Sequence, residues 1–331
     1  MAKSPQQQYR EVQMRDAVNV VLAGQLSSMA SKDANEALSF VVGQLTYTEA
    51  NLYARKRQDL QYKQFIPVST EVGEFATAVR YEMYDYAGRG KRSSGRGGDI
   101  NKVDVSFGEK TMPIYLGDIG YDYTQEELRQ SAFLRKSLPE ARSNAAFDAY
   151  DRHLNDVGLY GERDLTGLFN NPFVPVCTPL YGDWASKTPA EILKDINDMI
   201  QQVWVQSNYV EMPSMILLPP KCMTVLASTP RSEASDKTIL QYVQENNIAK
   251  LERSIDIEIR SAYGLDTAGA GGTARALVYT KSPDKLVMHV PMPIRFLAPQ
   301  PRGLLVEIAG EYKYGGVEFR YPGSAVYFDG L

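Results

Sequence analysis

A basic, glycine-rich segment between two strand-like segments constrains this chain more than any other feature. Residues 87–99 read AGRGKRSSGRGGD, and the flanking segments Val79–Tyr86 and Val103–Phe107 have the composition and near alternation of strands. The sequence therefore predicts a long hairpin with a tip that cannot fold on itself. Because little apolar sequence lies nearby for its strands to pack upon, we expect the hairpin to protrude.

The tip of this hairpin holds the one cluster of charge in the chain: Arg89, Lys91, Arg92 and Arg96. A surface for nucleic acid would place aromatic side chains among the basic ones for base stacking, and none lies between Ala87 and Asp99. A solvated loop, kept soluble by glycine and charge, is one interpretation. We favour a second, in which these four side chains clasp acidic groups on another subunit.

The composition excludes several classes of protein. The chain has 331 residues, and its 36 Lys and Arg against 40 Asp and Glu give a net charge of −4, so it has no general attraction to nucleic acid or anionic lipid. No apolar run approaches the roughly 18 residues of a membrane-spanning helix, so we expect no membrane partner. The two cysteines, Cys177 and Cys222, form no disulfide framework and are typical of a reducing compartment.

The first 64 residues are polar and rich in Gln, with apolar groups too scattered for a core. They predict an extended arm with short helices at Ala34–Leu45 and Ala50–Asp59, which we expect to pack against other chains. Farther along, Thr124 and Glu127 have the spacing of a capping box at a helix start. A second helix is predicted from Pro139 to a stop at Gly158. Its apolar stripe consists of Phe147, Tyr150, Leu154 and Val157.

A compact α/β unit is predicted from Thr188 to Val290. It begins with Thr188-Pro-Ala-Glu191, where a Thr cap, a proline in the first turn and a glutamate three residues after the cap indicate a helix start. Further helices are expected at 219–228 and 238–247, and strands at Ser214–Leu218, Asp256–Arg260 and Ala276–Thr280. The chain is then expected to close with strands at Leu304–Tyr314, Val317–Tyr321 and Ala325–Phe328, the first two forming a hairpin around Gly315-Gly316.

No arrangement of residues in the sequence indicates catalysis. The two histidines, His153 and His289, lie far apart; we place His153 on the side of its helix opposite the apolar stripe and interpret both rings as hydrogen-bonded or solvated. Neither cysteine has the spacing of a zinc site. Gly269–Gly272 lacks the Gly-Lys-Ser/Thr ending of a phosphate-binding loop and is interpreted as a flexible loop. We therefore predict no catalytic residue, no cofactor and no metal.

In this order, the parts resemble tailed-bacteriophage major capsid proteins of the Hong Kong 97-like (Johnson) fold, an α+β fold that encapsulin shells share. The resemblance rests on the extended loop at Arg80–Ile119, the long helix within Thr124–Val157 and the sequence GLFNNP at Gly167–Pro172. It implies an N-terminal arm (1–64), an extended β-hairpin loop (79–118), an α/β axial domain (188–290) and a peripheral β domain with a spine helix (65–78, 119–187 and 291–331).

The resemblance implies a structural protein rather than an enzyme. Axial domains would meet at symmetry axes to form pentamers and hexamers, while arms and extended loops would lap over neighbouring subunits to complete an icosahedral head shell. That shell would retain the phage DNA by enclosure and belong to the virion after assembly in the host cytoplasm. The 21 tyrosines agree with large surfaces buried against partners, although tyrosine also favours strands.

Further partners follow from the same resemblance. Only about 60 residues precede the expected peripheral domain, so we expect a separate scaffolding protein rather than a cleaved N-terminal segment. A portal protein and a cementing or decoration protein are also expected. Some relatives join a Lys of the extended loop to an Asn of a neighbour's peripheral domain. Here Lys91, Lys102 and Lys110 lie on or near the loop, but residues 291–331 contain no Asn, so we expect no such cross-link.

Two other interpretations remain open at this point. An encapsulin-type shell would use the same fold to enclose a cargo enzyme, and cargo in purified particles would identify it. From a different class, Thr188–Val290 could be the ligand-binding α/β domain of an enzyme. A small molecule bound stoichiometrically to a discrete oligomer would identify that second alternative.

Overall fold

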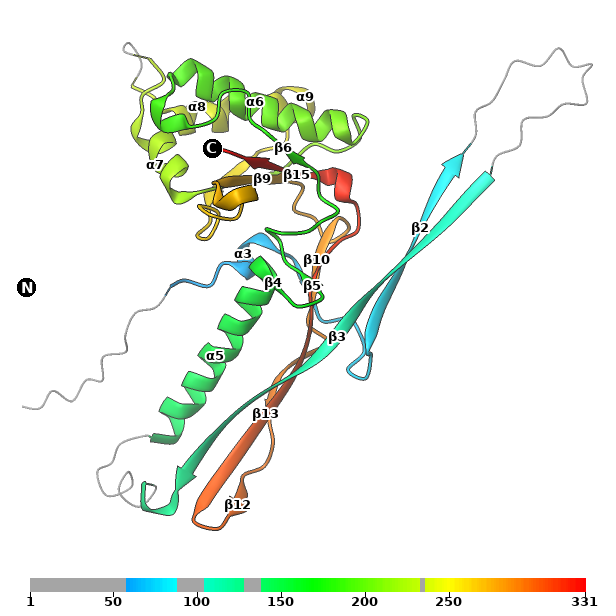
Figure 1. Ribbon diagram of the computed structural model, residues 1–331, viewed down its shortest axis with the longest axis vertical. Helices are drawn as coiled ribbons and strands as arrows, with labels where there is room; N and C mark the ends of the chain where they lie inside the picture. Colours follow the sequence, from blue (N-terminus) through cyan, green and yellow to red (C-terminus); the bar gives the residue numbers. More distant parts are fainter. Residues whose placement is uncertain (1–57, 88–103, 128–137, 233–235) are drawn as a thin grey trace, which may run out of the picture. The chain divides into compact units, whose positions relative to one another are not determined.

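The computed structural model describes residues 58–87, 104–127, 138–232 and 236–331 of the chain (Figure 1). Residues Asp59–Leu331 form one unit. The basic hairpin tip, the predicted helix at Ala34–Leu45 and all but the end of the predicted helix at Ala50–Asp59 lie outside the described residues.

The predicted hairpin is present as two long antiparallel strands. β2 (Ala78–Ala87) pairs with β3 (Asp104–Thr124) in a ladder that runs from Ala78 opposite Pro113 to Ala87 opposite Asp104. β2 lies at the edge of its sheet, so β3 is its only partner strand among the described residues. The alternation of VRYEMYDY therefore predicted the first strand correctly, whereas the second strand is much longer than the segment Val103–Phe107 suggested.

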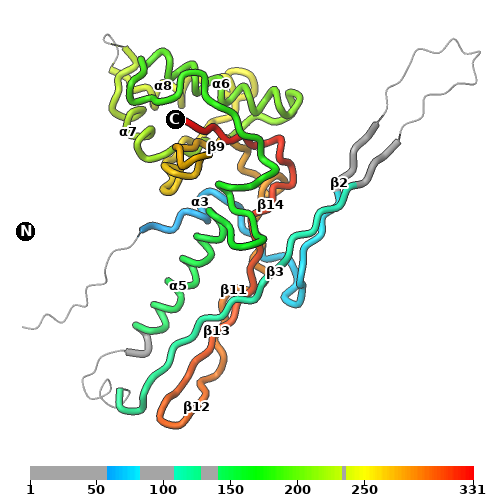
Figure 2. The backbone as a smooth tube through the Cα atoms, in the orientation of Figure 1, coloured from blue at the N-terminus to red at the C-terminus, as the bar shows by residue number. Residues whose placement is uncertain are grey.

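β3 continues without a break from the hairpin into a second pairing (Figure 2). From Ile114 to Thr124 it pairs antiparallel with β13 (Leu305–Gly315), and β13 also pairs with β11 (Met292–Phe296) and β12 (Gln300–Arg302). The strand order is β11-β13-β3-β2. One strand thus serves both the hairpin and the sheet, and it exchanges partners between Pro113 and Ile114.

The long helix α5 (Leu138–Tyr160) covers one face of this sheet. Tyr150 of α5 packs edge-on against Tyr312 of β13, with 4.8 Å between the ring centroids. The predicted apolar stripe is buried except for Phe147, which is 43% exposed and contacts the ring of Phe296 at 5.2 Å. The predicted capping box is present at the end of β3, since Glu127 N–H donates to the Thr124 hydroxyl at 3.0 Å.

The end of α5 corrects the sequence prediction. We expected Gly158 to stop the helix, but the helix runs to Tyr160. The residue that leaves the helical conformation is Gly161, whose φ of 77° lies in the left-handed region. Gly158 serves close packing instead, because a Cβ there would lie 3.2 Å from the Tyr62 side chain and 3.3 Å from that of Met288.

Small elements connect the helix to the sheets. α3 (Tyr62–Phe65) packs against α5, and β4 (Gly161–Glu162) forms a short hairpin with β5 (Leu165–Thr166) directly after α5. A three-stranded sheet has the order β1-β10-β14, formed by Val68–Ser69, Leu286–His289 and Val317–Phe319.

The predicted closing hairpin is wrong. Only Gly316 separates β13 from β14, yet β13 pairs with β3 and β14 pairs with β10 in a different sheet. The physical reason is a close backbone approach: a Cβ at Gly316 would lie 2.9 Å from the carbonyl oxygen of Thr166 and 3.1 Å from the Leu165 side chain. The glycine therefore lets the chain pass across β5 from one sheet to the next and does not reverse its direction.

The predicted α/β unit is present, with a five-stranded sheet in the order β6-β15-β9-β7-β8. Its strands are β6 (Val176–Cys177), β7 (Met215–Leu218), β8 (Glu258–Ser261), β9 (Arg275–Tyr279) and β15 (Ala325–Asp329). Its helices are α6 (Pro189–Gln206), α7 (Pro220–Ser228), α8 (Ile239–Glu245) and α9 (Ile248–Arg253), with 3-10 turns at Trp184–Ser186, Ala270–Gly272 and Pro322–Ser324. α6 begins at the predicted cap, where Thr188 N–H donates to the Glu191 carboxylate at 2.9 Å.

This sheet separates two apolar cores. Alternate residues of a strand point to opposite faces, so Leu217, Leu277 and Tyr327 join a core with α3, α5 and the three-stranded sheet. Their neighbours Ile216 and Val278 point the other way, into a core with α6 to α9. Because both faces of this sheet are buried, its strands are nearly continuous apolar runs in the sequence. The apolar segment Ser214–Leu218 (SMILL) predicted such a buried strand.

Two segments from outside 188–290 complete this sheet. β15, which we expected among the closing peripheral strands, pairs with β9, and β6 pairs with β15. Conversely, β10 lies within 188–290 but pairs with β1 and β14. These exchanges involve residues far apart in sequence, so patterns within single segments do not reveal them.

Candidate functional site

The predicted intersubunit contact lies outside the described residues. Its four side chains are Arg89, Lys91, Arg92 and Arg96. The stem that leads to them is described. Arg80 of β2 forms an ion pair across the ladder with Glu109 at 3.3 Å. Lys110 of β3 lies over the ring of Phe173, with its Nζ 3.7 Å from the ring centroid. This contact joins the stem to the segment that follows β5.

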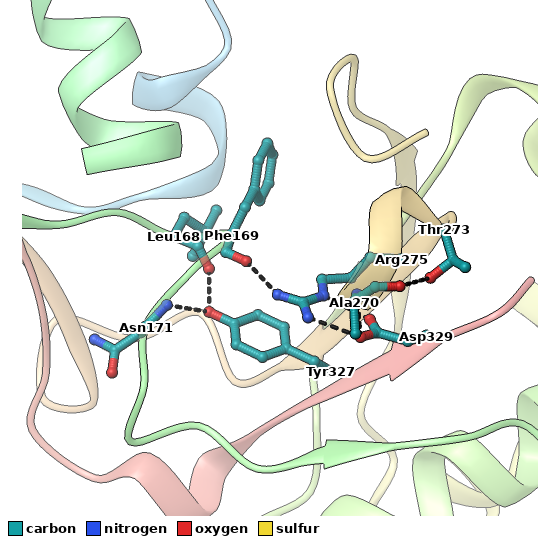
Figure 3. A network of polar contacts seen from close by, with 8 residues as sticks. All are labelled: Leu168, Phe169, Asn171, Ala270, Thr273, Arg275, Tyr327 and Asp329. Carbon is teal, nitrogen blue, oxygen red and sulfur yellow. Dashed lines mark hydrogen bonds and ion pairs between the residues drawn. The ribbon is translucent and has the colours of Figure 1, made fainter. Parts of the chain in front are cut away.

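A buried polar network joins the five-stranded sheet to the end of α5 (Figure 3). Its centre is Arg275 of β9, which lies opposite Asp329 of β15 in the ladder. The guanidinium donates to both carboxylate oxygens, from Nε to Oδ1 at 2.6 Å and from Nη2 to Oδ2 at 2.8 Å. Its Nη1 donates to the carbonyl oxygen of Phe169 at 2.7 Å. The planar guanidinium thus binds a carboxylate and a chain turn at once.

Tyr327 connects the same turn to β15. Its hydroxyl donates to the carbonyl oxygen of Leu168 at 2.6 Å and accepts the N–H of Asn171 at 3.1 Å. The Arg275 guanidinium lies over the Tyr327 ring at 4.5 Å. Two side chains from the sheet therefore hold three backbone groups of Leu168–Asn171.

The turn itself is the GLFNNP segment, one of the parts that carries the family resemblance. The side-chain oxygen of Asn170 accepts the N–H of Gly167 at 2.9 Å, and its amide donates to the carbonyl oxygen of Tyr160. Gly167 has no room for a side chain, because a Cβ there would overlap the backbone of Gly161 and Tyr160. The glycine and asparagine of this motif therefore return the chain across the end of α5.

Electrostatics keep Arg275 and Asp329 charged. Burial alone would raise the pKa of Asp329, but hydrogen bonds from Arg275 and from the N–H of Ala270 bring that pKa below its ordinary value. The hydrogen bond to Asp329 raises the pKa of Arg275. A pair that stays ionised at neutral pH acts as a structural tie and not as an acid or a base.

The sequence analysis singled out the GLFNNP turn but not Arg275, Asp329 or Tyr327, the sheet residues of this network. The available signal was a charged residue at the start of the apolar strand RALVY and another at the end of AVYFD. Because Asp and Arg are almost never fully buried without a partner, that signal predicts a pair once the two strands are known to be neighbours. The sequence alone did not show that these two strands are neighbours.

The glycine-rich loop before β9 belongs to the same structure. Ala270 N–H donates to Asp329 Oδ2 at 2.9 Å, and Gly269 N–H donates to the carbonyl oxygen of Thr273 at 2.9 Å. The loop predicted as flexible is therefore a hydrogen-bonded turn. Its Ala270 N–H binds the Asp329 carboxylate, whose charge would repel a phosphate, and its Gly269 and Gly272 N–H groups donate to backbone carbonyl oxygens.

His153 does not lie where the sequence analysis placed it. Its ring packs edge-on against Tyr314 of β13 at 4.8 Å, and its Nδ1 lies 2.7 Å from the Tyr312 hydroxyl. Its Nε2 lies 3.1 Å from the Glu162 carboxylate. Hydrogen bonds, first from Tyr314 and then from His153, lower the pKa of Glu162. The prediction failed because the sheet contacts a wider arc of α5 than the apolar stripe alone.

His289 is hydrogen-bonded, which is one of the two states that the sequence analysis allowed. Its Nε2 lies 2.7 Å from Oε2 of Glu318 on the neighbouring strand β14, and both side chains are 3% exposed. Arg320 approaches the same carboxylate, with its Nε at 3.6 Å. The pair lies between β10 and β14 and helps to fix their contact.

The cysteines and acidic groups of the described part indicate no reactive centre. Burial raises the pKa of Cys177, and it raises the pKa of Cys222 to about 11, so neither thiol is activated as a nucleophile. In the described ranges, no group of three or more His, Cys, Asp or Glu side chains could hold a metal ion. No helix there is long and apolar enough to cross a bilayer.

Large apolar side chains are exposed instead. Phe75, Leu251 and Leu304 are 88%, 79% and 76% exposed. Phe75 lies in a tight turn whose neighbour Glu74 forms an ion pair with Arg295 at 2.5 Å, so the aromatic ring is presented on an anchored turn.

Comparison with known proteins identifies the family. Residues 88–331 match the family model described as major capsid protein. Among solved structures, the chain is similar to the capsid of Myoviridae phage XM1, with 19% identity, a TM-score of 0.75 and coverage of 87% of this chain and 98% of that chain. No curated protein matches.

Two further structures have the same fold at lower similarity. The capsid of a native GTA particle is 13% identical, with a TM-score of 0.60 and coverage of 88% of this chain and 98% of that chain. A virus-like particle from Pyrococcus furiosus is 16% identical, with a TM-score of 0.51 and coverage of 81% and 91%. The predicted α+β class and Hong Kong 97-like fold are confirmed.

The family match also decides between the alternatives for function. The model that matches describes capsid proteins, which favours the head shell over an encapsulin-type compartment. It covers well over half of the chain, including the hairpin tip, β3, α5 and every strand that follows. The chain therefore belongs to the major capsid protein family and is a phage head-shell protein.

Proposed function

We propose that this chain self-assembles into pentamers and hexamers that form an icosahedral head enclosing phage DNA. The observation that carries the proposal is the hairpin of β2 and β3. Between Ala78 and Pro113 these strands pair only with each other among the described residues. A two-stranded ribbon is marginally stable in water, so a neighbouring copy that covers it would supply the missing surface.

Within such a shell we propose for each part of the chain the role that the sequence analysis predicted. Residues 188–290 would act as the axial domain, which meets its copies at the symmetry axes. The arm (1–64) and the extended loop (79–118) would lap over neighbours, with the basic tip acting as the clasp. Exposed Phe75 and Leu304 agree with large contacts outside the axial domain.

The role we infer is structural and not enzymatic. The polar side chains that catalysis would need are occupied by structural partners: Arg275 with Asp329, His289 with Glu318, and His153 with Tyr312 and Glu162. Each of these groups holds one element against another. We infer no cofactor.

Other components would complete the particle. A separate scaffolding protein, a portal and a cementing protein are the partners we propose, with assembly in the host cytoplasm. The DNA would be retained by enclosure, because a net charge of −4 provides no general attraction to phosphate.

Negative-stain microscopy of the expressed full chain tests this function. We expect closed shells or free pentamers and hexamers. A discrete small oligomer that binds a small molecule stoichiometrically would contradict the proposal and favour an enzyme subunit.

A further inference from the structure

The sheet of β11, β13, β3 and β2 has a face that points away from α5, and on this face acidic residues lie directly opposite acidic residues. In the ladder of β3 and β13, Asp118 lies opposite Glu311 and Asp122 lies opposite Glu307. Tyr312 of the same ladder points to the other face, against α5. Directly opposed like charges destabilise a pair of strands, so this arrangement costs the isolated subunit free energy.

Only one member of each acidic pair has a basic partner within the described residues. Glu311 is bound by Arg295 at 2.8 Å, and Glu307 is bound by Arg302 at 2.9 Å. Asp118 and Asp122 are exposed, and no basic side chain of the described part lies within ion-pair distance of either carboxylate. Two carboxylates of this face therefore form no ion pair among the described residues, although Lys313 lies on the same face.

The surface between the two acidic pairs carries no bulky side chain. Gly120 lies opposite Ala309 in the ladder, and both residues are exposed. A depression continues from this row toward the start of β13, and its lining consists of Gly120, Tyr121, Asp122, Leu305, Glu307 and Arg302, the last of which is ion-paired with Glu307. Because β3 and β13 are hydrogen-bonded to each other along this whole segment, a partner cannot insert a strand between them and would lie on the face of the sheet. It would bind through its side chains.

The chain contains one segment with the complementary charge. Residues 88–103, which join β2 to β3, include five basic residues and one acidic residue. Glycines and serines between the charges leave this segment free of bulky side chains, so it fits a shallow surface.

The tip cannot reach this face on its own chain. Asp104 and Asp118 are joined by continuous strand, and fourteen residues at about 3.3 Å each separate them by about 45 Å. Sixteen residues connect β2 to β3, and half of that length extends at most about 29 Å. The occupant must come from another copy.

We propose that the sheet face bearing Asp118 and Asp122, with Gly120 and Ala309 between them, is the docking surface for the basic hairpin tip of a second copy. This inference rests on the proposed self-assembly and names the surface that receives the clasp. Ion pairs from the tip would neutralise the two unpaired carboxylates and remove the repulsion between opposed acids.

Reversal of charge on each side tests the pairing. Asp118→Lys with Asp122→Lys, and separately Arg89→Glu with Arg92→Glu, should each lower the yield of closed shells at least tenfold. All four changes in one chain should restore the yield to within about threefold. The matched control is Glu252→Lys with Asp284→Lys, which changes the net charge equally at two exposed acids outside this face and should leave the yield unchanged. Circular dichroism of each variant checks that the subunit folds.

Failure of the docking surface and failure of the proposed function give different results. If the unaltered chain forms no shells, the proposed function fails. If shells form equally well when Asp118 and Asp122 are lysines, or if the four-residue swap restores nothing, only the docking surface is wrong.

A cross-linking experiment gives a second readout that does not depend on yield. In a background with Cys177→Ala and Cys222→Ala, chains with Ser94→Cys are mixed with chains with Ala309→Cys, assembled and treated with a short bismaleimide. We expect a dimer band in the mixture and none from either chain alone. A dimer formed with Ser4→Cys in place of Ser94→Cys would assign the face to the N-terminal arm and overturn the proposal.

Discussion

The ammonium group of Lys110 lies 3.7 Å from the centre of the Phe173 ring and joins the hairpin stem to the segment between β5 and β6. A cation–π contact near the surface contributes about 0.5–1 kcal/mol. Lys110→Met keeps the length of the side chain and removes its charge, so we expect amide hydrogens of residues 108–113 to exchange about two- to fivefold faster. Lys110→Arg retains the contact and serves as the control. Equal exchange in all three chains would show that the contact does not restrain the stem.

The buried pair of Arg275 and Asp329 predicts a large effect on stability. Asp329→Ala leaves a buried guanidinium without its carboxylate, which costs about 3–5 kcal/mol. The control is Arg275→Met with Asp329→Leu, which removes both charges and should recover most of the loss. Urea unfolding of the unassembled subunit measures both values. A loss below about 1 kcal/mol for Asp329→Ala would contradict a structural role for the pair.

The same pair predicts a dependence on pH. The pKa of Asp329 is lower in the folded chain than its ordinary value of 3.8, so the unfolded state binds the proton more readily. The stabilisation is therefore complete above about pH 5 and is lost as the pH falls through the lowered folded value. Asp329→Asn should flatten the acidic limb of the stability curve. If Asp329→Asn loses stability at low pH as the unaltered chain does, other carboxylates are responsible for the acid sensitivity.

The hairpin tip predicts a response to salt. Replacement of Arg89, Lys91, Arg92 and Arg96 by serine should weaken assembled particles and reduce their sensitivity to salt. Exposed ion pairs contribute about 0.2–1 kcal/mol each, so only the combined change should be visible. Thermal disruption of particles across a salt series measures it. If the midpoint does not move, the tip serves solubility alone.

The absence of asparagine from residues 291–331 predicts a shell without covalent cross-links through that segment. Lys110 is available on β3, but the last asparagine, Asn247, is buried and its side chain donates to the carbonyl oxygen of Val243. Without an amide in that segment to attack, no ammonia can leave there. Mature particles boiled in detergent should give one band at 37.0 kDa. A ladder that resists reductant would contradict this.

Local patterns predicted most elements of the described part. The capping residues Thr124 and Thr188 start helical segments, and the apolar run at Ser214–Leu218 is a buried strand. These features depend on residues within a few positions of each other, where propensity and capping determine the outcome. The basic tip, the most informative feature of the sequence, lies outside the described residues and stays a prediction.

Errors arose where distant residues decide the structure. Gly158 resembles a helix stop, but Tyr62 and Met288 pack against it and Gly161 ends the helix. Gly316 resembles a hairpin turn, but the backbone of β5 lies beneath it. The pair of Arg275 and Asp329 was missed for the same reason, since 54 residues separate the partners in sequence.

The uninterrupted course of β3 makes the hairpin a lever. No loop or gap separates its half beside β2 from its half beneath α5, so a pull at the Asp104 end cannot be absorbed by a flexible joint. The strand leads directly to Gly117, where the ring of Tyr312 occupies the space that a side chain would fill. In the proposed shell, a load that a neighbouring copy places on the hairpin would therefore reach the sheet beside α5 in the same subunit.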